Sequence, residues 1–224
     1  VLHETGQPLH AFDAAAINGD TVRVMHLPEK TKFITLDGVE RTLSSNDLMI
    51  CNREEGMCIA GVFGGLRSGV TEATTDLFLE SATFSPVSVR RTSRRHDLHT
   101  DASYRFERGT DPEMTLYALR RAAMLVKELA GGEITGDIID IYPTPVRKAL
   151  VKCSLDRMAK LIGKEIPVET VKTILYSLDI SITDEEPGIL YLEIPSYRVD
   201  VTREADVTEE VLRVYGYDNI GVSH

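Results

Sequence analysis

Short strand patterns separated by turn residues fill positions 21–80, and this spacing predicts a β-rich fold for the N-terminal half of the chain. Residues 21–26 alternate apolar and polar side chains, which is typical of a strand with one buried face. Asp37-Gly38 stands between two β-prone runs and predicts a hairpin over residues 32–43. Further strands are expected at residues 47–51, 57–62 and 76–80.

A long helix is predicted to follow these strands. Asp111 is a good N-cap, Pro112 fits the first helical position, and an apolar stripe continues to the glycines at 131–132. Residues 138–145, IIDIYPTP, predict a closing strand and then a proline-containing linker. We therefore expect a domain boundary after residue 144.

Residues 145–224 predict a second, smaller α+β domain. Its expected elements are a strand at 150–153, helices at 154–162 and 167–177, strands at 180–183 and 189–194, and a helix at 203–215. This β-α-α-β-β-α order resembles a winged helix, although the acidic residues of the last helix disfavour contact with DNA phosphates. The predicted fold class is α+β, with a mixed, β-rich domain that ends in a long capped helix at 1–144 and a small winged-helix-like domain at 145–224.

Composition excludes several functional classes. The formal net charge is -10, which argues against a free-standing nucleic-acid binder, and no apolar run approaches the ~20 residues that span a bilayer. Three cysteines without a CxxC pair are expected to be reduced thiols of a cytoplasmic protein. Because the chain starts at Val1, we expect it to be a piece of a longer protein.

The segment 79–111 combines a carboxylate with a local excess of positive charge. Glu80 ends a short apolar strand, and residues 90–108 then contain six arginines against three acids. Such a segment is able to hold an anionic group beside a polar group. Ion pairing of Arg105 and Arg108 with their acidic neighbours is an equally good interpretation.

Neither a nucleophile with its base nor a metal centre is evident. The chain has no GxSxG, HExxH or GxGxxG motif, and no metal ligands are expected at His96 and His99, which lack acidic or cysteine partners at ligand spacing. His10 lies between apolar residues and either satisfies a backbone carbonyl or orients a water or an ester. The glycines at 64–65 form either a plain turn or a place where a ligand approaches the backbone.

Six segments, in order along nearly the whole chain, resemble the beta subunit of bacterial phenylalanyl-tRNA synthetase. They are GQPLHAFD at 6–13, LDG at 36–38, IAGVFGG at 59–65, LESATFSP at 79–86, LHTDASYRFERGTDP at 98–112 and PSYRVDVTREADVTEEVLRVYGYDNI at 195–220. The resemblance implies the tRNA-editing domain of that subunit, to about residue 143, and the small domain that follows it. It also implies that aminoacylation, with its ATP and magnesium, belongs to the full synthetase with its alpha subunit, and that this part of the chain needs no cofactor.

The resemblance further implies hydrolysis of tyrosine that is wrongly attached to tRNA(Phe). An apolar pocket rejects an isostere with one added hydroxyl by only about 10², whereas a site that must hydrogen-bond a hydroxyl rejects the analogue lacking it by roughly 10⁴ to 10⁵. By this resemblance Glu80 accepts the tyrosyl hydroxyl, Ala102 leaves room for the ring, and Gly64 and Gly65 let the backbone approach the substrate.

The remaining implied roles concern the ester and the tRNA. Thr100 and His10 border the ester and its attacking water, and Arg94 and Arg95 are weaker candidates for contact with tRNA phosphates. The expected partners are the acceptor end of tRNA(Phe) carrying tyrosine and the alpha subunit, with no membrane and no DNA. The alternative is a non-catalytic RNA-binding or assembly module.

Overall fold

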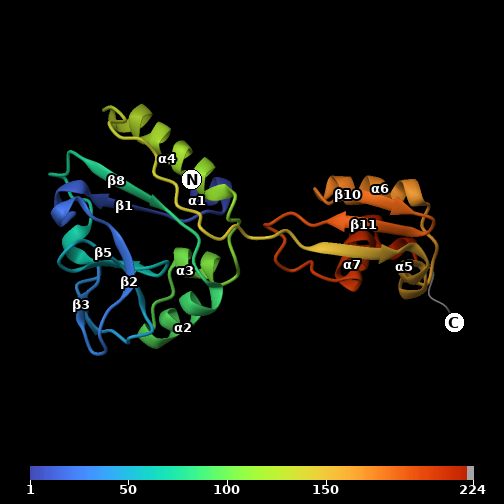
Figure 1. The fold of residues 1–224 in the computed structure, drawn as a ribbon, viewed down its shortest axis with the longest axis horizontal. Coiled ribbons are helices and arrows are strands. Elements are labelled where there is room, and N and C mark those ends of the chain that lie inside the picture. The colour runs from blue at the N-terminus through green and yellow to red at the C-terminus, as the bar shows by residue number, and fades with distance from the viewer. Residues whose placement is uncertain (221–224) are drawn as a thin grey trace. The chain divides into compact units, whose positions relative to one another are not determined.

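The structure is a computed structural model that describes residues 1–220, and it divides the chain into two compact units (Figure 1). Unit 1 comprises Val1–Ile141 and unit 2 comprises Tyr142–His224. The sequence predicts this division after residue 144.

The strands of unit 1 are short, as the sequence predicts, and their pairings are antiparallel. β1 (Leu9–Asp13) pairs with β8 (Leu77–Ser81), and β3 (Lys32–Ile34) pairs with β4 (Glu40–Thr42) in the hairpin predicted from Asp37-Gly38. A four-stranded sheet has the order β2 (Arg23–His26), β5 (Leu48–Cys51), β6 (Gly56–Ile59) and β7 (Phe63–Gly64). Short helical turns are α1 (Leu2–Thr5), η1 (Ala14–Ala16), η2 (Asn18–Asp20) and η3 (Leu66–Ser68).

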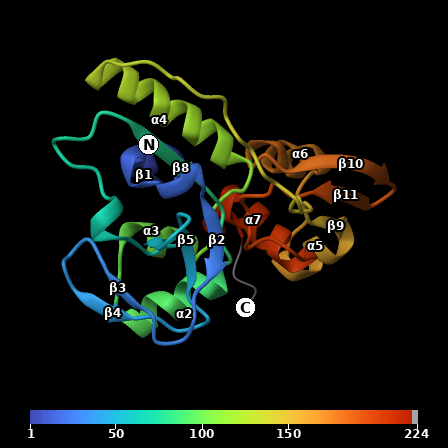
Figure 2. The same cartoon turned by 60° about the vertical axis from the view of Figure 1, so that its left-hand side comes forward.

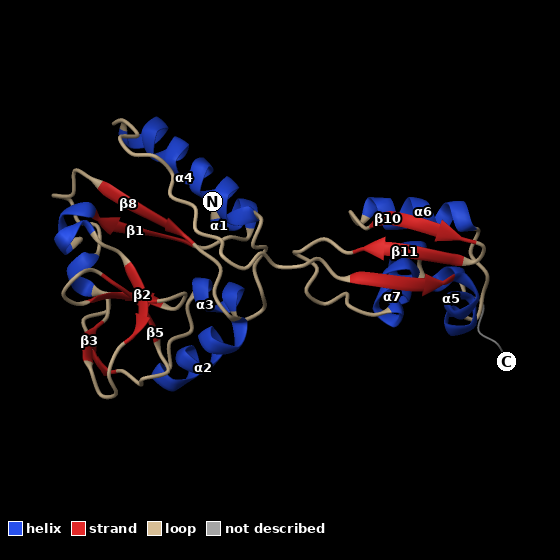
Figure 3. Ribbon diagram, viewed as in Figure 1, coloured by secondary structure: helices blue, strands red, loops and turns tan. Residues whose placement is uncertain are grey.

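Two helices of unit 1 are not predicted from the sequence. The arginine-rich run forms α2 (Pro86–His96), which begins at an N-cap, Ser85, and ends at Asp97 in the left-handed conformation. The polar residues after it form α3 (Asp101–Phe106). Figure 3 shows α2 below the strands of the four-stranded sheet and α3 beside them.

The long helix α4 (Met114–Ala130) begins later than the sequence predicts. The side chain of Asp111 accepts a hydrogen bond from the Glu113 amide at 3.1 Å, within the turn before the helix rather than as its N-cap. Figure 2 shows α4 running alongside the β1–β8 pair. The prediction of a closing strand within residues 138–145 is wrong, because the described backbone has neither helix nor strand between α4 and β9 (Leu150–Ser154).

The core of unit 1 joins strands, turns and helices. Phe12, Met49 and Ile59 are fully buried. Phe84, just before α2, packs edge-on against Phe106 of α3, with ring centroids 5.1 Å apart. This contact fixes the ends of the two unpredicted helices against the sheet.

Unit 2 has the predicted element order. It contains β9 (Leu150–Ser154), α5 (Leu155–Ile162), α6 (Val168–Ser177), β10 (Ser181–Glu186), β11 (Ile189–Glu193), α7 (Glu204–Tyr215) and η4 (Tyr217–Asn219). Its antiparallel sheet has the order β10-β11-β9, and its own apolar core includes Leu175, Leu190 and Val207. The α+β fold class is therefore confirmed.

Candidate functional site

The pairing of β1 with β8 brings two candidate residues together from distant parts of the chain. His10 is the direct partner of Glu80 in this antiparallel ladder. Side chains of directly paired residues project from the same face of a sheet and are close neighbours. His10 and Glu80 therefore form the centre of the candidate site.

Glu80 is a partly buried carboxyl group with no partner of its own. Within residues 1–220 its side chain forms neither a hydrogen bond nor an ion pair. Burial raises the pKa of Glu80 to about 7, because desolvation disfavours the charged form. Near neutral pH the group is therefore present in both protonation states.

His10 faces this carboxyl as a neutral imidazole. Burial lowers the pKa of His10, and the ring packs against Phe12 with centroids 4.3 Å apart. Its buried Nε2 atom has no hydrogen-bond partner among the described residues. The interpretation that His10 satisfies a backbone carbonyl through this nitrogen is therefore not supported.

Gly64 lies next to His10 in the site, whereas Gly65 lies within the core. A Cβ atom at Gly64 would lie 2.6 Å from Cε1 of His10 and 2.8 Å from Cδ1 of Leu36. A Cβ atom at Gly65 would instead lie 2.6 Å from the Met57 carbonyl oxygen, within the core. Gly64 thus lets His10 approach the backbone, whereas Gly65 has a packing reason to be glycine.

Replacement of Gly64 by alanine is expected to lower the free energy of unfolding by about 1–3 kcal/mol, because the added methyl overlaps His10 and Leu36. Urea unfolding of unit 1 measures this change. Gly136→Ala is the matched control, since nothing lies within 4 Å of a Cβ atom there. Equal stability of the two variants would contradict the proposed close approach of His10.

Cys58 is a neighbour of the site that sequence reasoning missed. It pairs with Gly64 in the β6–β7 ladder, and its thiol donates to the Phe63 carbonyl at 3.4 Å. Burial and then the negative charge of Glu80 raise the pKa of Cys58 well above its usual value. Cys58 is thus an inert, protonated thiol, and only its β6–β7 pairing could have indicated its position.

Thr100 connects α3 to the turn just before β7, the strand that contains Gly64. Its hydroxyl donates to the Val62 carbonyl at 2.8 Å and accepts from the Ser103 amide at 3.0 Å, within a capping box. Ala102, on the first turn of α3, is partly buried and packs against the core of unit 1. The structure therefore links Thr100 to the turn before β7, and Ala102 to the core of unit 1.

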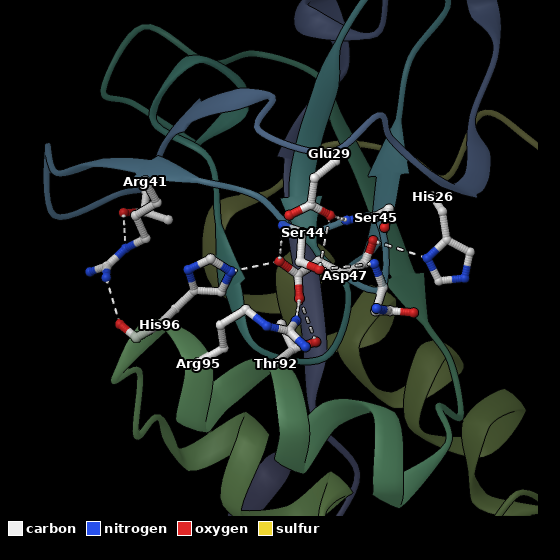
Figure 4. A network of polar contacts seen from close by, with 11 residues as sticks. His26, Glu29, Arg41, Ser44, Ser45, Asp47, Thr92, Arg95 and His96 are labelled. Atoms are coloured by element: carbon white, nitrogen blue, oxygen red, sulfur yellow. Dashed lines mark hydrogen bonds and ion pairs between the residues drawn. The ribbon is translucent and has the colours of Figure 1, made fainter.

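Arg94 and Arg95 have different environments. Arg94 is exposed, whereas the guanidinium of Arg95 forms an ion pair with Asp47 (Figure 4). Asp47 is fully buried and also accepts hydrogen bonds from Thr92 at 2.9 Å and His96 at 2.7 Å. The role of Arg95 in tRNA contact stays a prediction, but its guanidinium is already engaged inside the protein.

We call Asp47, Thr92, Arg95 and His96 the Asp47 cluster. Burial by itself would raise the pKa of Asp47, yet hydrogen bonds from His96, the Ser44 amide and Thr92 together hold the pKa below its usual value. Arg41 extends the cluster by donating to the carbonyl oxygen of His96 at 2.7 Å. The cluster fastens the last turn of α2 to the residues before β5, and so fixes the chain that leads to Thr100.

The site does not coincide with a cluster of metal ligands among the described residues. Within residues 1–220 no group of three or more His, Cys, Asp or Glu side chains is arranged to hold a metal ion. One hollow of unit 1 is lined by other residues, among them Asn18, Asn52 and Arg67. No helix of the described chain is both long and apolar enough to cross a membrane.

Comparison with known protein families assigns both parts of the chain. The sequence model of the family described as B3/4 domain matches residues 1–131. The chain belongs to the B3/4 domain family. A second family, described as tRNA synthetase B5 domain, matches residues 151–217. The candidate site therefore lies wholly within the B3/4 domain.

Curated relatives with both domains are beta subunits of phenylalanine–tRNA ligase. The chain is 57% identical to that of Bacteroides fragilis over 222 residues, which is 99% of the chain and 27% of the relative. It is 57% identical to that of Porphyromonas gingivalis over 98% of the chain and 27% of the relative, and 44% identical to that of Geobacter sulfurreducens over 98% and 28%. The resemblance inferred from the six segments is therefore confirmed. The chain spans little more than a quarter of the length of these relatives.

Similar solved structures include one that covers most of this chain. It is an N-terminal fragment of the phenylalanyl-tRNA synthetase beta subunit from Pyrococcus horikoshii. The TM-score is 0.48 and the identity 18%, over 93% of this chain and 60% of that one.

Proposed function

We propose that the B3/4 domain hydrolyses the ester of tyrosine wrongly attached to tRNA(Phe), as part of a phenylalanine–tRNA ligase. The observation that carries this proposal is the unpartnered Glu80 carboxyl, paired across β1 and β8 with a neutral His10 whose Nε2 has no partner. Two polar groups kept without protein partners beside a glycine are suited to a polar substrate group.

Glu80 is proposed to read the phenolic hydroxyl. An ionised carboxylate accepts the phenol proton in a hydrogen bond, and a protonated carboxyl group donates to the phenol oxygen. Because the pKa of Glu80 is about 7, both modes are accessible near neutral pH. Phenylalanine offers no such partner and would leave the carboxyl buried and unpaired, which is costly.

His10 and Thr100 are proposed to border the ester. A neutral imidazole accepts a hydrogen bond from water and so orients it for attack on the carbonyl carbon. Thr100 contributes by where it lies rather than by a hydrogen bond to the substrate, since its hydroxyl already bonds Val62 and Ser103. Ala102 is proposed to leave space for the ring, and Gly64 to let the backbone approach the substrate. We assign no general base beyond this orientation of water.

ATP and magnesium are proposed to serve the ligase reaction of the whole synthetase, with aminoacylation in the alpha subunit. The editing step needs only water and the charged tRNA. The proposed partners of this chain are therefore the acceptor end of tRNA(Phe) and the alpha subunit.

The test is deacylation of Tyr-tRNA(Phe) by the full heteromeric synthetase carrying Glu80→Ala. Loss of one hydrogen bond to a partly buried group is worth roughly 1–3 kcal/mol, so the deacylation rate is expected to fall roughly 10- to 100-fold. Aminoacylation with phenylalanine should be unchanged. Glu133→Ala removes an exposed carboxyl of the same unit and is the matched control.

A normal deacylation rate in Glu80→Ala would remove the proposal. The site would then belong to a non-catalytic RNA-binding or assembly module. Titration with free tyrosine separates the two functions further, because a module without the editing site has no reason to bind tyrosine more tightly than phenylalanine.

A further inference from the structure

The arginines of α2 fall into two groups that the sequence does not distinguish. Arg95 points to the buried Asp47 and is held there. Arg90, Arg91 and Arg94 are exposed, and none of them forms an ion pair with any residue of the described chain. We call these three residues the α2 arginine face.

Helical spacing places the three side chains on one side of α2. Arg90 and Arg94 are four residues apart, and Arg91 and Arg94 are three apart, so both pairs are neighbours on the helix surface. Like charges at these spacings repel and destabilise an isolated helix. α2 tolerates them because Ser85 caps its start and the Asp47 cluster holds its end.

The neighbouring helix α3 carries a further arginine without an ion pair in the described chain. α2 and α3 contact each other, and Arg105 of α3 is exposed without an ion pair among residues 1–220. The guanidinium of Arg108 lies 3.5 Å from the ring centroid of Tyr104, whose side chain is 54% exposed. Of the three acids in residues 90–108, Glu107 pairs with Arg108 and Asp97 contacts His99 at 3.4 Å, whereas Asp101 is exposed and forms no ion pair in the described chain.

We propose that the α2 arginine face binds the phosphate backbone of the tRNA whose charged end enters the candidate site. The inference rests on the proposed function for the identity of the RNA. Guanidinium groups match phosphate oxygens in paired hydrogen bonds, and their positive charge is opposite to that of the RNA backbone. The face is positive although the net charge of the whole protein chain is -10. A protein partner is less suitable, because protein interfaces centre on apolar residues and only Val87 is exposed and apolar on α2.

Position also favours this assignment. α2 leads through a short connection to Thr100, at the start of α3, and Thr100 bonds the Val62 carbonyl in the turn just before β7, the strand of Gly64. Phosphates held on α2 would therefore be bound by a helix that is joined through three residues to the proposed ester site. Binding of the backbone there restrains the free 3′ end without any contact to the bases.

The experiment uses the full heteromeric synthetase carrying the triple variant Arg90→Gln, Arg91→Gln and Arg94→Gln. Binding of uncharged tRNA(Phe) and deacylation of Tyr-tRNA(Phe) are measured from 50 to 300 mM salt. Each lost phosphate contact reduces the slope of log affinity against log salt by roughly 0.7–0.9, so the slope should fall by roughly 2–3. KM for deacylation should rise about 10-fold near physiological salt, with kcat unchanged.

Two further variants make the result specific. Lysine at the same three positions keeps the charge and should retain most of the salt slope. Arg120→Gln removes an exposed arginine of α4 that has no ion pair in the described chain, and should change neither KM nor slope. Aminoacylation by the triple variant reports whether the heteromer is intact.

Three outcomes would overturn the inference: an unchanged salt slope in the triple variant, an equal effect of Arg120→Gln, or loss of subunit assembly, which would assign the face to a protein partner. The inference and the proposed function fail separately. If Glu80→Ala deacylates normally and the triple variant has a reduced salt slope, the editing proposal is refuted and the RNA-binding surface is supported. If Glu80→Ala loses deacylation and the triple variant has an unchanged salt slope, editing is supported and the RNA-binding surface is refuted.

Discussion

Replacing Asp47 by alanine is expected to lower the free energy of unfolding of unit 1 by about 3–5 kcal/mol. The carboxyl is fully buried and accepts bonds from Thr92, Arg95, His96 and the Ser44 amide. Removing it leaves the buried hydroxyl of Thr92 and the charge of Arg95 without their common partner. The last turn of α2 then loses its attachment to the sheet.

Urea unfolding measures the loss in free energy of unfolding. Hydrogen exchange at the amides of α2 and β5 assigns that loss to unit 1. Asp140→Ala removes an exposed acid of the same unit and is the control. The pKa of Asp47 lies below its usual value, so its contribution is present above that usual value and is lost as the pH falls through the lowered pKa. A loss under 1 kcal/mol at neutral pH would show that the cluster does not hold α2.

Glu80→Gln is expected to change how stability depends on pH. The pKa of Glu80 is raised from its ordinary 4.5 to about 7 in the folded protein. Between these values the folded state keeps a proton that the unfolded state has lost, so the stability of the wild-type protein falls as pH rises and levels off above about 7. Over this range the cost reaches roughly 3 kcal/mol. Glutamine does not titrate, so the Glu80→Gln protein does not lose this stability as the pH rises.

The variant should therefore be close to wild type in stability at pH 4.5 and more stable by roughly 3 kcal/mol at pH 8. Unfolding of both proteins across this range measures the difference, and titrations of all other groups cancel in it. Glu133→Gln should follow the wild-type curve, because Glu133 is exposed. Parallel curves for wild type and Glu80→Gln would mean that the Glu80 carboxyl is ordinary and solvated.

The strands of unit 1 were predictable because turn residues and alternation act locally. Asp37-Gly38 determines the hairpin whatever packs against it, and the order of elements in unit 2 follows from similar local patterns. α2 was not predictable from apolar periodicity, because this helix buries only Val89, Thr92 and Ser93. Polar contacts to the Asp47 cluster hold it, and these depend on residues far away in the chain.

The candidate site divides in the same way. The resemblance supplies Glu80 and His10 as candidates, and their direct pairing requires the register of β1 with β8. Neither the environment of Cys58 nor the burial of Asp47 has a local signal, since a cysteine in a strand and an aspartate after Ser44-Ser45-Asn46 are ordinary. The different roles of Gly64 and Gly65 likewise depend on which atoms approach each backbone.

The pairing of β1 with β8 also sets an order of events at the ribosome. The residues that form the centre of the site, His10 and Glu80, are separated by the whole of the four-stranded sheet and the β3–β4 hairpin. At a synthesis rate of roughly 5–20 residues per second, β1 waits roughly 4 to 14 s before its partner strand exists. During that interval Phe12, fully buried in the finished domain, is exposed to chaperones or to other nascent chains.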